Sequence, residues 1–449
     1  MTDLPARFHD TQAPNHKKML IANTLIVPGF KLPVIHDGCI LIEDNLIKDI
    51  GPSNQLLDKY KLSVPVIDGS GFIIMPGLFN SHTHVAMGFF RGLGHGIESM
   101  IESFLFPAEK SLTPELLEPL SYSYIFDGLK SGVTSFVDHY YFSKGVANAF
   151  EKFGVRGWIG ETIADLGGAF PGRASFERAR DLIDNQHFSN LIRHVIAPHA
   201  TDTISMELLT EVSSFAAKNG LPIHMHLAQT RGETARVAQR DQMTPVEKAY
   251  RCGALTDQSL VVHLTDVNAS DLNRIKESKA TFGWCPGSTV IYENLAPIKD
   301  IFERDIPVAI GTDCAASNDS SDILQELRTG FLFAKDRNID QAKIKPEKLL
   351  SFATTIPAKT LGMEDKMGTL EVGKFADIVC LKRSLSSEPS ENIHSNLIFS
   401  MGARDVRHVM IDGRWRLWNS ELVGLSHRTL QEDYITAVNE INRRVRESK

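Results

Sequence analysis

Two histidines separated by one residue, His82 and His84, follow a short apolar run and the turn residues Pro76 and Gly77. In extended backbone, side chains two positions apart project from the same face, so both imidazoles can reach one ion. Zinc accepts a neutral imidazole nitrogen at about 2.0–2.1 Å. Such a pair also occurs in surface turns, and the metal hypothesis therefore depends on residues further along the chain.

More histidines stand at or near the ends of later apolar runs. His224 and His226 share one face of a predicted strand. We expect one of them to be a metal ligand and the other to line the pocket or support its neighbour. His263 ends the next run, a position where a single histidine is more often a hydrogen-bonded core residue.

Asp313 ends the last apolar run of the central segment. Its carboxylate could bind an ion with one oxygen and hold a bound water with the other. The alternative role is that of a helix N-cap, because a predicted helix follows. We expect Ser320 or Ser321 to cap that helix instead.

Regularly alternating elements must position these residues. Short strands are predicted at 73–79, 134–138, 156–161, 193–198, 222–226, 260–263, 280–284 and 307–311, and stretches with helical periodicity between them at 114–131, 176–184, 206–219 and 322–335. Eight strands alternating with helices over roughly 290 residues predict an α/β fold of the (β/α)8 TIM-type barrel. The carboxyl ends of barrel strands converge on one face, which would bring the polar residues together.

Short β-type runs broken by turn residues occur on both sides of this segment. They predict a small β-sandwich domain made from 19–71 and 368–422, with the barrel, 72–367, inserted between them. The N-terminal residues 1–18 are polar and are expected to form an arm. Helical spacing of apolar residues predicts a C-terminal helix within 423–449.

Composition limits the class of protein. The chain has 449 residues, 42% hydrophobic and 23% charged, and a formal charge of −7. These values are typical of a soluble globular protein and argue against a nucleic-acid partner. No apolar run approaches the roughly 20 residues that span a bilayer. Five scattered cysteines without C-x-x-C spacing indicate reduced thiols. We therefore expect a cytoplasmic protein with no membrane partner.

Five motifs occur in order: 76–84 (PGLFNSHTH), 131–138 (SGVTSFVD), 224–228 (HMHLA), 311–318 (GTDCAASN) and 368–377 (GTLEVGKFAD). Together they resemble the amidohydrolase superfamily in its cytosine deaminase/chlorohydrolase branch, over about residues 19–420. The resemblance implies a barrel with a split β-sandwich. It also implies one divalent ion, usually zinc and sometimes iron, whose ligands are His82, His84, His226 and Asp313.

The same resemblance implies hydrolytic deamination of an amino-substituted nitrogen heterocycle, such as a purine, pterin, pyrimidine or s-triazine. The ion would lower the pKa of a bound water toward 7, Asp313 would accept its proton as general base, and His263 would steady the attacking oxygen. His199 falls where the deaminases contact substrate. By analogy we expect a homo-oligomer, a dimer or larger.

Gln229 departs from the family pattern, because the deaminases place a glutamate three residues after the histidine that corresponds to His226. A glutamine can hydrogen-bond a ring nitrogen but cannot transfer a proton. Either Asp313 and water relay the proton, or the substrate needs only a hydrogen bond there, or its leaving group departs unaided. Hydrolytic displacement of chloride or an alkylamine from an s-triazine is therefore the alternative function, and a catalytically silent binding protein is the remote one.

Other candidate substrate contacts are less specific. Trp284 stands where relatives commonly have a histidine, and its indole would either form a flat wall of the pocket or be a core residue that closes the barrel mouth. Arg91 and Arg173 lie in predicted βα loops, which usually shape specificity. Glu161, at a strand end, and Glu233 are possible substitutes for the missing glutamate.

Overall fold

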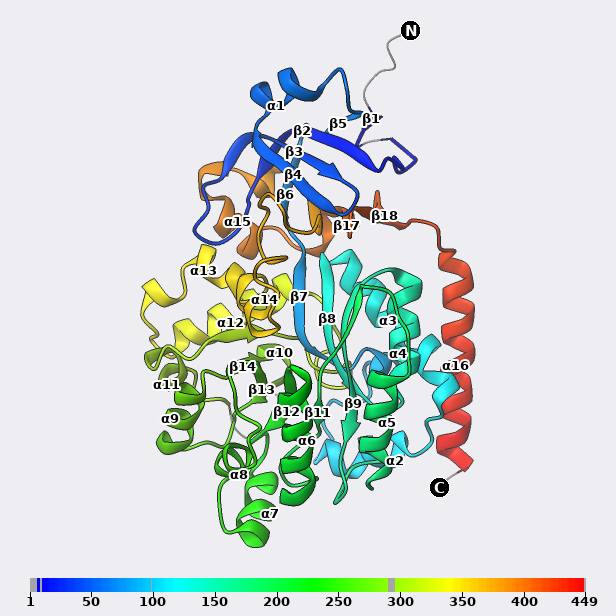
Figure 1. Cartoon of the computed structure of the whole chain (residues 1–449), viewed down its shortest axis with the longest axis vertical. Helices are drawn as coiled ribbons and strands as arrows, with labels where there is room; N and C mark the ends of the chain where they lie inside the picture. Colours follow the sequence, from blue (N-terminus) through cyan, green and yellow to red (C-terminus); the bar gives the residue numbers. More distant parts are fainter. Residues whose placement is uncertain (1–5, 9, 98, 290–294, 448–449) are drawn as a thin grey trace.

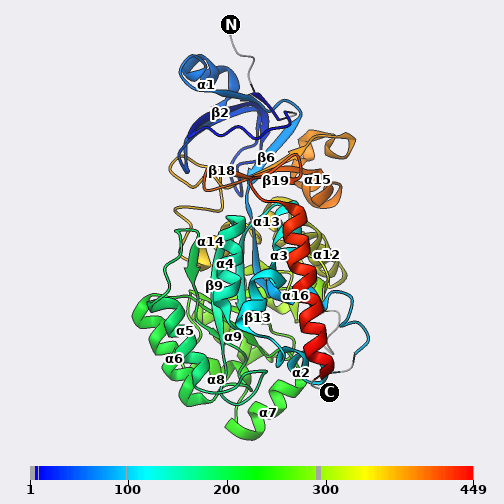
Figure 2. The ribbon, with the colours of Figure 1, turned by 90° about the vertical axis from the view of Figure 1, so that its right-hand side faces the viewer.

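The computed structural model describes residues 6–8, 10–97, 99–289 and 295–447. A sheet-rich part lies at one end of the molecule, and a larger part of alternating strands and helices forms the rest (Figure 1). The turned view in Figure 2 shows the same two parts. The chain starts in the first part, passes through the second, returns to the first at β16, and ends in a helix beside the second.

In the described part of the chain, ten strands form one sheet at that end, built from both ends of the sequence. The strands are β1 (Ala6–Arg7), β2 (Lys18–Ile26), β3 (Ile35–Glu43), β4 (Leu46–Pro52), β5 (Val66–Asp68), β6 (Phe72–Pro76), β16 (Ile378–Lys382), β17 (Val406–Ile411), β18 (Arg414–Trp418) and β19 (Glu421–Leu422). The pairing is antiparallel in β2–β3–β4 and in β6–β16–β17–β18–β19. The pairs β1–β5, β5–β2 and β2–β6 are parallel, so the sheet is mixed.

Both faces of this sheet are covered by apolar side chains. One face carries a cluster that includes Phe8, Ile74 and Trp415. On the other face, Leu56 of the helix α1 (Ser53–Tyr60) joins a cluster with Leu20 and Leu41. Burial on both faces explains why β2 reads as a nearly continuous apolar run instead of a strict alternation.

The run predicted as one strand over 73–79 is two strands, and the single-strand prediction is wrong. β6 belongs to the mixed sheet, and β7 (Leu78–Thr83) is the first strand of the parallel part. The chain crosses between the sheets at Gly77, where a Cβ atom would lie 2.1 Å from Thr134 Oγ1. Only a residue without a side chain fits that approach.

The parallel strands form two four-membered paths. One is β10 (Ile192–His194), β9 (Arg156–Ile163), β8 (Val133–Tyr140) and β7, with β11 (Ala197–Pro198) also on β9; the other is β12 (Ile223–Leu227), β13 (Ser259–His263), β14 (Thr281–Trp284) and β15 (Val308–Ile310). Parallel bridges join the paths at both edges, between Ile196 and Ile223 and between Thr83 and Asp313. The result is a curled parallel sheet consistent with a TIM-type barrel.

Helices connect these strands on the outside (Figures 1 and 2). They are α3 (Pro114–Lys130), α4 (Ser143–Phe153), α5 (Ala174–Asp184), α6 (Met206–Asn219), α7 (Arg231–Asp241), α8 (Pro245–Arg251), α9 (Ala269–Ser278), α11 (Ile298–Glu303), α12 (Ile323–Asp336), α13 (Pro346–Ser351) and α14 (Thr355–Thr360). The α12 N-cap is Asp322, whose carboxylate accepts hydrogen bonds from the Leu324 and Gln325 amides. The prediction of Ser320 or Ser321 as the cap is wrong, because Asp322 stands one residue before the first helical turn.

Shorter segments complete the chain. The stretch after β7 forms the 3₁₀ helix η1 (Val85–Phe90), the π-helix η2 (Ile101–Leu105) and α2 (Phe106–Glu109). α10 (Pro286–Thr289) follows β14, α15 (Ile393–Phe399) precedes β17, and α16 (His427–Glu447) lies along α3 and buries Leu430, Ala437 and Ile441. No helix among the described residues is long and apolar enough to cross a membrane.

Candidate metal centre

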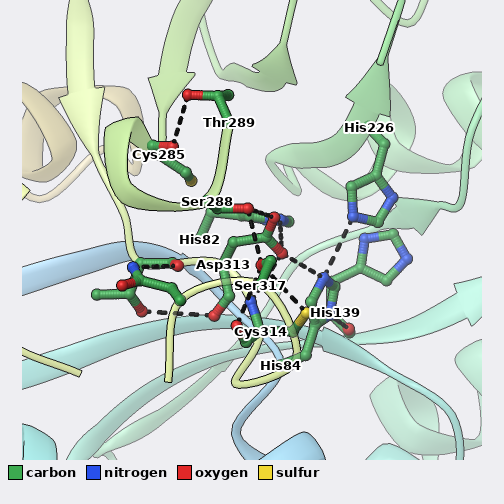
Figure 3. A network of polar contacts seen from close by, with 12 residues as sticks. His82, His84, His139, His226, Cys285, Ser288, Thr289, Asp313, Cys314 and Ser317 are labelled. Atoms are coloured by element: carbon green, nitrogen blue, oxygen red, sulfur yellow. Dashed lines mark hydrogen bonds and ion pairs between the residues drawn. The ribbon is translucent and has the colours of Figure 1, made fainter. Parts of the chain in front are cut away.

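The side chains of His82, His84, His226 and Asp313 meet at the carboxyl ends of the parallel strands (Figure 3). Asp313 Oδ1 lies 3.4 Å from His82 Nε2 and 3.5 Å from His84 Nε2, and the Nε2 atoms of His84 and His226 are 3.3 Å apart. Ligand atoms about 2.0–2.1 Å from a tetrahedral ion are separated by about 3.3–3.4 Å. The buried Nε2 of His82 has no hydrogen-bond partner among the described residues. These four residues therefore fit one divalent ion.

The second nitrogen of each imidazole orients the first. His226 Nδ1 donates to the His199 carbonyl at 2.8 Å, and His84 Nδ1 contacts the His139 carbonyl. His82 Nδ1 lies 2.7 Å from His224 Nε2. With each Nδ1 carrying the hydrogen, each Nε2 presents its lone pair to the ion position. His224, one of the two histidines expected near the site, thus supports His82.

Asp313 is held in place by contacts on both carboxylate oxygens. Ser288 Oγ donates to Oδ2 at 2.5 Å, and the Cys314 amide donates to Oδ1 at 2.8 Å. The Asp313 amide in turn donates to the His82 carbonyl at 2.9 Å, which joins the end of β15 to β7. Ser288 follows β14 in a short turn, and no pattern in the sequence marked it as part of the site.

Burial and neighbouring imidazoles disfavour the charged forms of His84, His226 and His263. Burial lowers the pKa of His84 and of His263 to about 3, and it holds the pKa of His226 well below its usual range. Burial would raise the pKa of Asp313, but contact with His82 and the nearby His263 and His84 rings lowers it overall. Neutral imidazoles beside an ionised carboxylate are the protonation states that metal binding requires.

His263 stands beside the four candidate ligands. Its ring stacks on the His226 ring at 5.4 Å between centroids, and its ligand atom groups with those of His82 and Asp313. The backbone at His263 has a φ of 81°, and Asp313 has a φ of 63°. Left-handed backbone at non-glycine residues is uncommon and clusters at functional sites.

A cavity of about 60 Å³ opens beside the cluster. His199 and Gln229 line it, as do His139 of β8 and the apolar side chains of Met87, Met100, Ile101, Leu105 and Phe106. Glu109, at the end of α2, also lines the cavity although it is only 4% exposed. Burial raises the pKa of Glu109 to about 8, against the opposing effect of the neighbouring Tyr140 hydroxyl. No pattern in the sequence singles out Glu109, because it lies in a short helix of a loop.

Three predicted substrate contacts lie outside this cavity. Arg91 is on the surface, paired with Asp127, and Arg173 is paired there with Glu211. Trp284 is 2% exposed and packs near Phe302 and Gly330 in the helix layer outside the strands. This position matches the alternative role of a core tryptophan, and we do not propose substrate contact for Arg91, Arg173 or Trp284.

The two glutamates considered as substitutes for the missing glutamate are also engaged elsewhere. Glu161 accepts hydrogen bonds from Arg178 and Ser143 and lines a different cavity. Glu233 accepts from the Gln229 amide at 2.7 Å and from Thr201. Glu233 therefore fixes the backbone that carries Gln229, and neither carboxylate lines the cavity beside the candidate ligands.

The chain is similar in sequence and in fold to proteins that have already been described. The chain matches the model of the Amidohydrolase family over residues 73–416. It is 30% identical over 420 residues to a 5-methylthioadenosine/S-adenosylhomocysteine deaminase of Thermodesulfovibrio yellowstonii, covering 92% of this chain and 94% of the relative. It is 32% identical over 404 residues to a 5'-deoxyadenosine deaminase of Methanothermobacter thermautotrophicus, covering 89% and 93%. The crystal structure of a Xanthomonas campestris adenosine deaminase with bound zinc superposes with a TM-score of 0.87 at 26% identity, covering 98% of this chain and 100% of that one.

Proposed function

The chain belongs to the amidohydrolase family, and on that premise we propose that it releases ammonia from adenine nucleosides at the cluster around Asp313. It is a hydrolase of carbon–nitrogen bonds, and hydrolytic deamination of an amino-substituted heterocycle is its activity class. The family resemblance drawn from the five motifs is thereby confirmed. The adenine nucleoside is favoured because both named relatives are deaminases of such compounds.

The observation that carries the proposal is the spacing of the three Nε2 atoms and Asp313 Oδ1, which suits one divalent ion. When bound, such an ion lowers the pKa of a water toward neutrality and supplies the nucleophile. Asp313 would accept a proton from the attacking water and return it to the amino group, which would leave as ammonia. His263, neutral and beside Asp313, hydrogen-bonds the attacking oxygen.

Gln229 and His199 position the heterocycle in this proposal. Both line the cavity, and His199 Nδ1 is held by the Thr203 hydroxyl at 2.9 Å, which leaves its other ring nitrogen for substrate. The side-chain amide of Gln229 can donate to or accept from a ring nitrogen but cannot take up its proton. The proton on the ring nitrogen must then come from another group or from water.

The cavity also bears on how the substrate enters. Pockets that enclose whole small molecules usually measure about 300–1,000 Å³, several times the 60 Å³ seen here. A nucleoside therefore needs the apolar segment of η2 and α2 to move outward. That segment contains a π-helix, an element frequent at functional sites.

Ammonia release tests the proposed activity. We would load the purified protein with zinc and assay adenosine, 5'-deoxyadenosine, 5'-methylthioadenosine and S-adenosylhomocysteine, with guanine and amino-s-triazines as comparators. Release from at least one adenine nucleoside, with kcat/KM higher than for the comparators, is the expected result. Silence over the whole panel with a fully occupied metal site would contradict the proposal.

Displacement of chloride or an alkylamine from an s-triazine is the second candidate, and Gln229 is the observation that favours it. The variant Gln229→Glu separates the two functions because it adds a group that can transfer a proton. We expect it to raise ammonia release from adenosine by about tenfold or more. Impaired turnover of a chloro-s-triazine in the same variant would support the second function. Gln239→Glu, on the exposed face of α7, is the matched control.

The proposal also covers the domain organisation, the identity of the ion, the cellular compartment and the oligomeric state. The parallel strands form a closed (β/α)8 barrel over 72–367. The segments 19–71 and 368–422 form a second domain, and the barrel is inserted between them. The ion is zinc, with iron as the alternative, and the protein acts as a cytoplasmic homo-oligomer. Elemental analysis and light scattering of the purified protein test the ion and the assembly.

A further inference from the structure

His139 is a buried imidazole in the cavity that the mechanism above does not use. It is the penultimate residue of β8 and is 1% exposed. Its ring stacks on the His226 ring at 4.8 Å between centroids and meets the His199 ring edge-on at 5.9 Å. It therefore lies between a candidate metal ligand and a candidate substrate contact, next to the labelled His84 in Figure 3.

Neither ring nitrogen of His139 has a hydrogen-bond partner among the residues that the structure describes. The neighbouring imidazoles differ in this respect. The Nδ1 atoms of His84 and His226 contact carbonyls, that of His82 contacts His224, and that of His199 contacts Thr203. The contact between His139 and His84 uses the His139 backbone carbonyl and not its ring. A buried imidazole without partners is costly, so an unpartnered one indicates a missing ligand or water.

The missing partner is not the ion. Within the described residues, the groups of side chains that could hold a metal are His82 with His84 and His226, and His82 with His263 and Asp313. His139 belongs to neither group. It does line the cavity that reaches Gln229 and His199. A molecule in that cavity is therefore the candidate partner.

The chemistry of the ring indicates which molecule. The ring is buried and both of its nitrogens lack a partner among the described residues. A neutral imidazole offers one donor and one acceptor. The amidine edge of an aminoheterocycle, with a ring nitrogen next to an amino or keto group, offers the complementary pair. The side-chain amide of Gln229 has the same pairing capacity and no charge.

We propose that His139 is a substrate-binding residue whose ring hydrogen-bonds the polar edge of the heterocycle and helps to select it. The inference rests on the proposed deamination and assigns a specificity contact within it. In this arrangement His139 joins Gln229 and His199 in orienting the substrate. The role does not require His139 to change its protonation state.

Two substitutions separate hydrogen bonding from packing. His139→Phe keeps a flat ring against His226 but removes both nitrogens, and His139→Asn keeps a donor and an acceptor on a smaller side chain. We expect His139→Phe to lower kcat/KM for adenosine at least tenfold, mainly through KM, and His139→Asn to recover part of that loss. Zinc content and Tm should match the unmodified protein. His194→Gln, on β10 and outside the cavity, is the control.

Three outcomes would overturn the inference. A His139→Phe variant with kcat/KM within twofold of the parent would show that the ring meets an ordered water only. Loss of zinc in that variant would show that the ring supports His226 instead of binding substrate. An equal fall in kcat with unchanged KM would also exclude a binding role. If the unmodified protein deaminates nothing, the proposed function is wrong, and the role of His139 that depends on it is wrong too. If the unmodified protein is active and His139→Phe is equally active, only the role of His139 is wrong.

Discussion

At the scale of single residues, the site depends on which nitrogen of each imidazole carries the hydrogen. The contacts of His84, His226 and His82 through Nδ1 direct three Nε2 lone pairs to one point, where Asp313 adds an oxygen. Ser288 performs the equivalent task for Asp313 by donating to the oxygen that faces away from His82 and His84. The direction of each candidate ligand is thus set by residues that are not themselves candidate ligands.

Removal of the proton-accepting carboxylate tests the role of Asp313. Asp313→Asn preserves the shape and tolerates the left-handed backbone at this position, whereas alanine would add backbone strain. We expect kcat to fall by about 10²- to 10⁴-fold, the usual contribution of a general base. Ammonia release and the circular dichroism spectrum are the measurements. Global unfolding of the variant would contradict a role at the strand ends.

Glu109 gives stability a predictable pH dependence. Its pKa is raised from 4.5 to about 8, so between these values the folded protein holds a proton that the unfolded chain releases. Because the unfolded state then binds fewer protons, the free energy of unfolding falls as pH rises through this window, by up to about 1.4 kcal/mol per pH unit. Glu109→Gln removes this decline.

Chemical denaturation of the parent and of Glu109→Gln at intervals from pH 5 to pH 9 measures the effect. The two curves should diverge with rising pH and run parallel above about pH 8. Glu277→Gln, at an exposed position of α9, is the control and should follow the parent. Curves of equal slope for all three proteins would show that Glu109 is not held protonated in the fold.

At the scale of elements, the centre sits where two parallel sheet paths meet. β7 supplies His82, β12 supplies His226, and the loop after β15 supplies Asp313, so the ligand set exists only when β7 and β15 are adjacent. Asp313 itself makes the bridge, through its amide and the His82 carbonyl. The same contact that joins β15 to β7 therefore also brings Asp313 to the histidines.

Gly311 controls this contact. A Cβ atom at 311 would lie 2.6 Å from the His82 amide nitrogen and 2.8 Å from the His82 carbonyl oxygen, closer than side chains pack. We expect Gly311→Ala to push β15 away from β7, lower stability by about 1–3 kcal/mol and reduce zinc content. Tm and elemental analysis check both effects. Gly402→Ala, where a Cβ meets nothing within 4 Å, should leave both unchanged.

At the scale of the whole molecule, one buried arginine ties the parallel part to the ten-stranded sheet. Arg156, at the start of β9, donates to both oxygens of Asp377 at 2.6 and 3.0 Å and to Asp412 at 2.9 Å. Its guanidinium also lies over the Phe375 ring at 4.2 Å. The segments that carry these partners are more than two hundred residues away in the chain, and their contact holds the returning strands beside the parallel sheet.

Loss of the Arg156 ion pairs should lower the free energy of unfolding substantially. Arg156→Met leaves the Asp377 carboxylate buried without its cation, a change that typically costs about 3–5 kcal/mol. Chemical denaturation measures the free energy of unfolding. Arg173→Met, which breaks an exposed pair with Glu211, is the control and should cost no more than about 1 kcal/mol. An equal decrease in the free energy of unfolding in the two variants would show that the buried ion pairs of Arg156 do not stabilise the fold.

Much of this architecture could be read from local patterns. Apolar runs of strand length separated by helical periodicity indicated the parallel part, and the motifs around His82, His226 and Asp313 indicated the family. These signals are local because a strand buried on both faces needs a continuous apolar run, and a ligand at its end needs an imidazole or carboxylate at a fixed position. The residue types at the strand ends and the alternation of strands with helices were therefore accessible from the sequence alone.

Other features depend on contacts between distant segments, which only the tertiary structure decides. The division of 73–79 at Gly77 follows from the approach of Thr134, and the outward position of Trp284 follows from the space beside Gly330. Ser288 reaches Asp313, and Glu109 and His139 share a cavity with Gln229, although each belongs to a different element. A sequence states which groups are available, but the direction of each side chain is set by the neighbours that the fold brings to it.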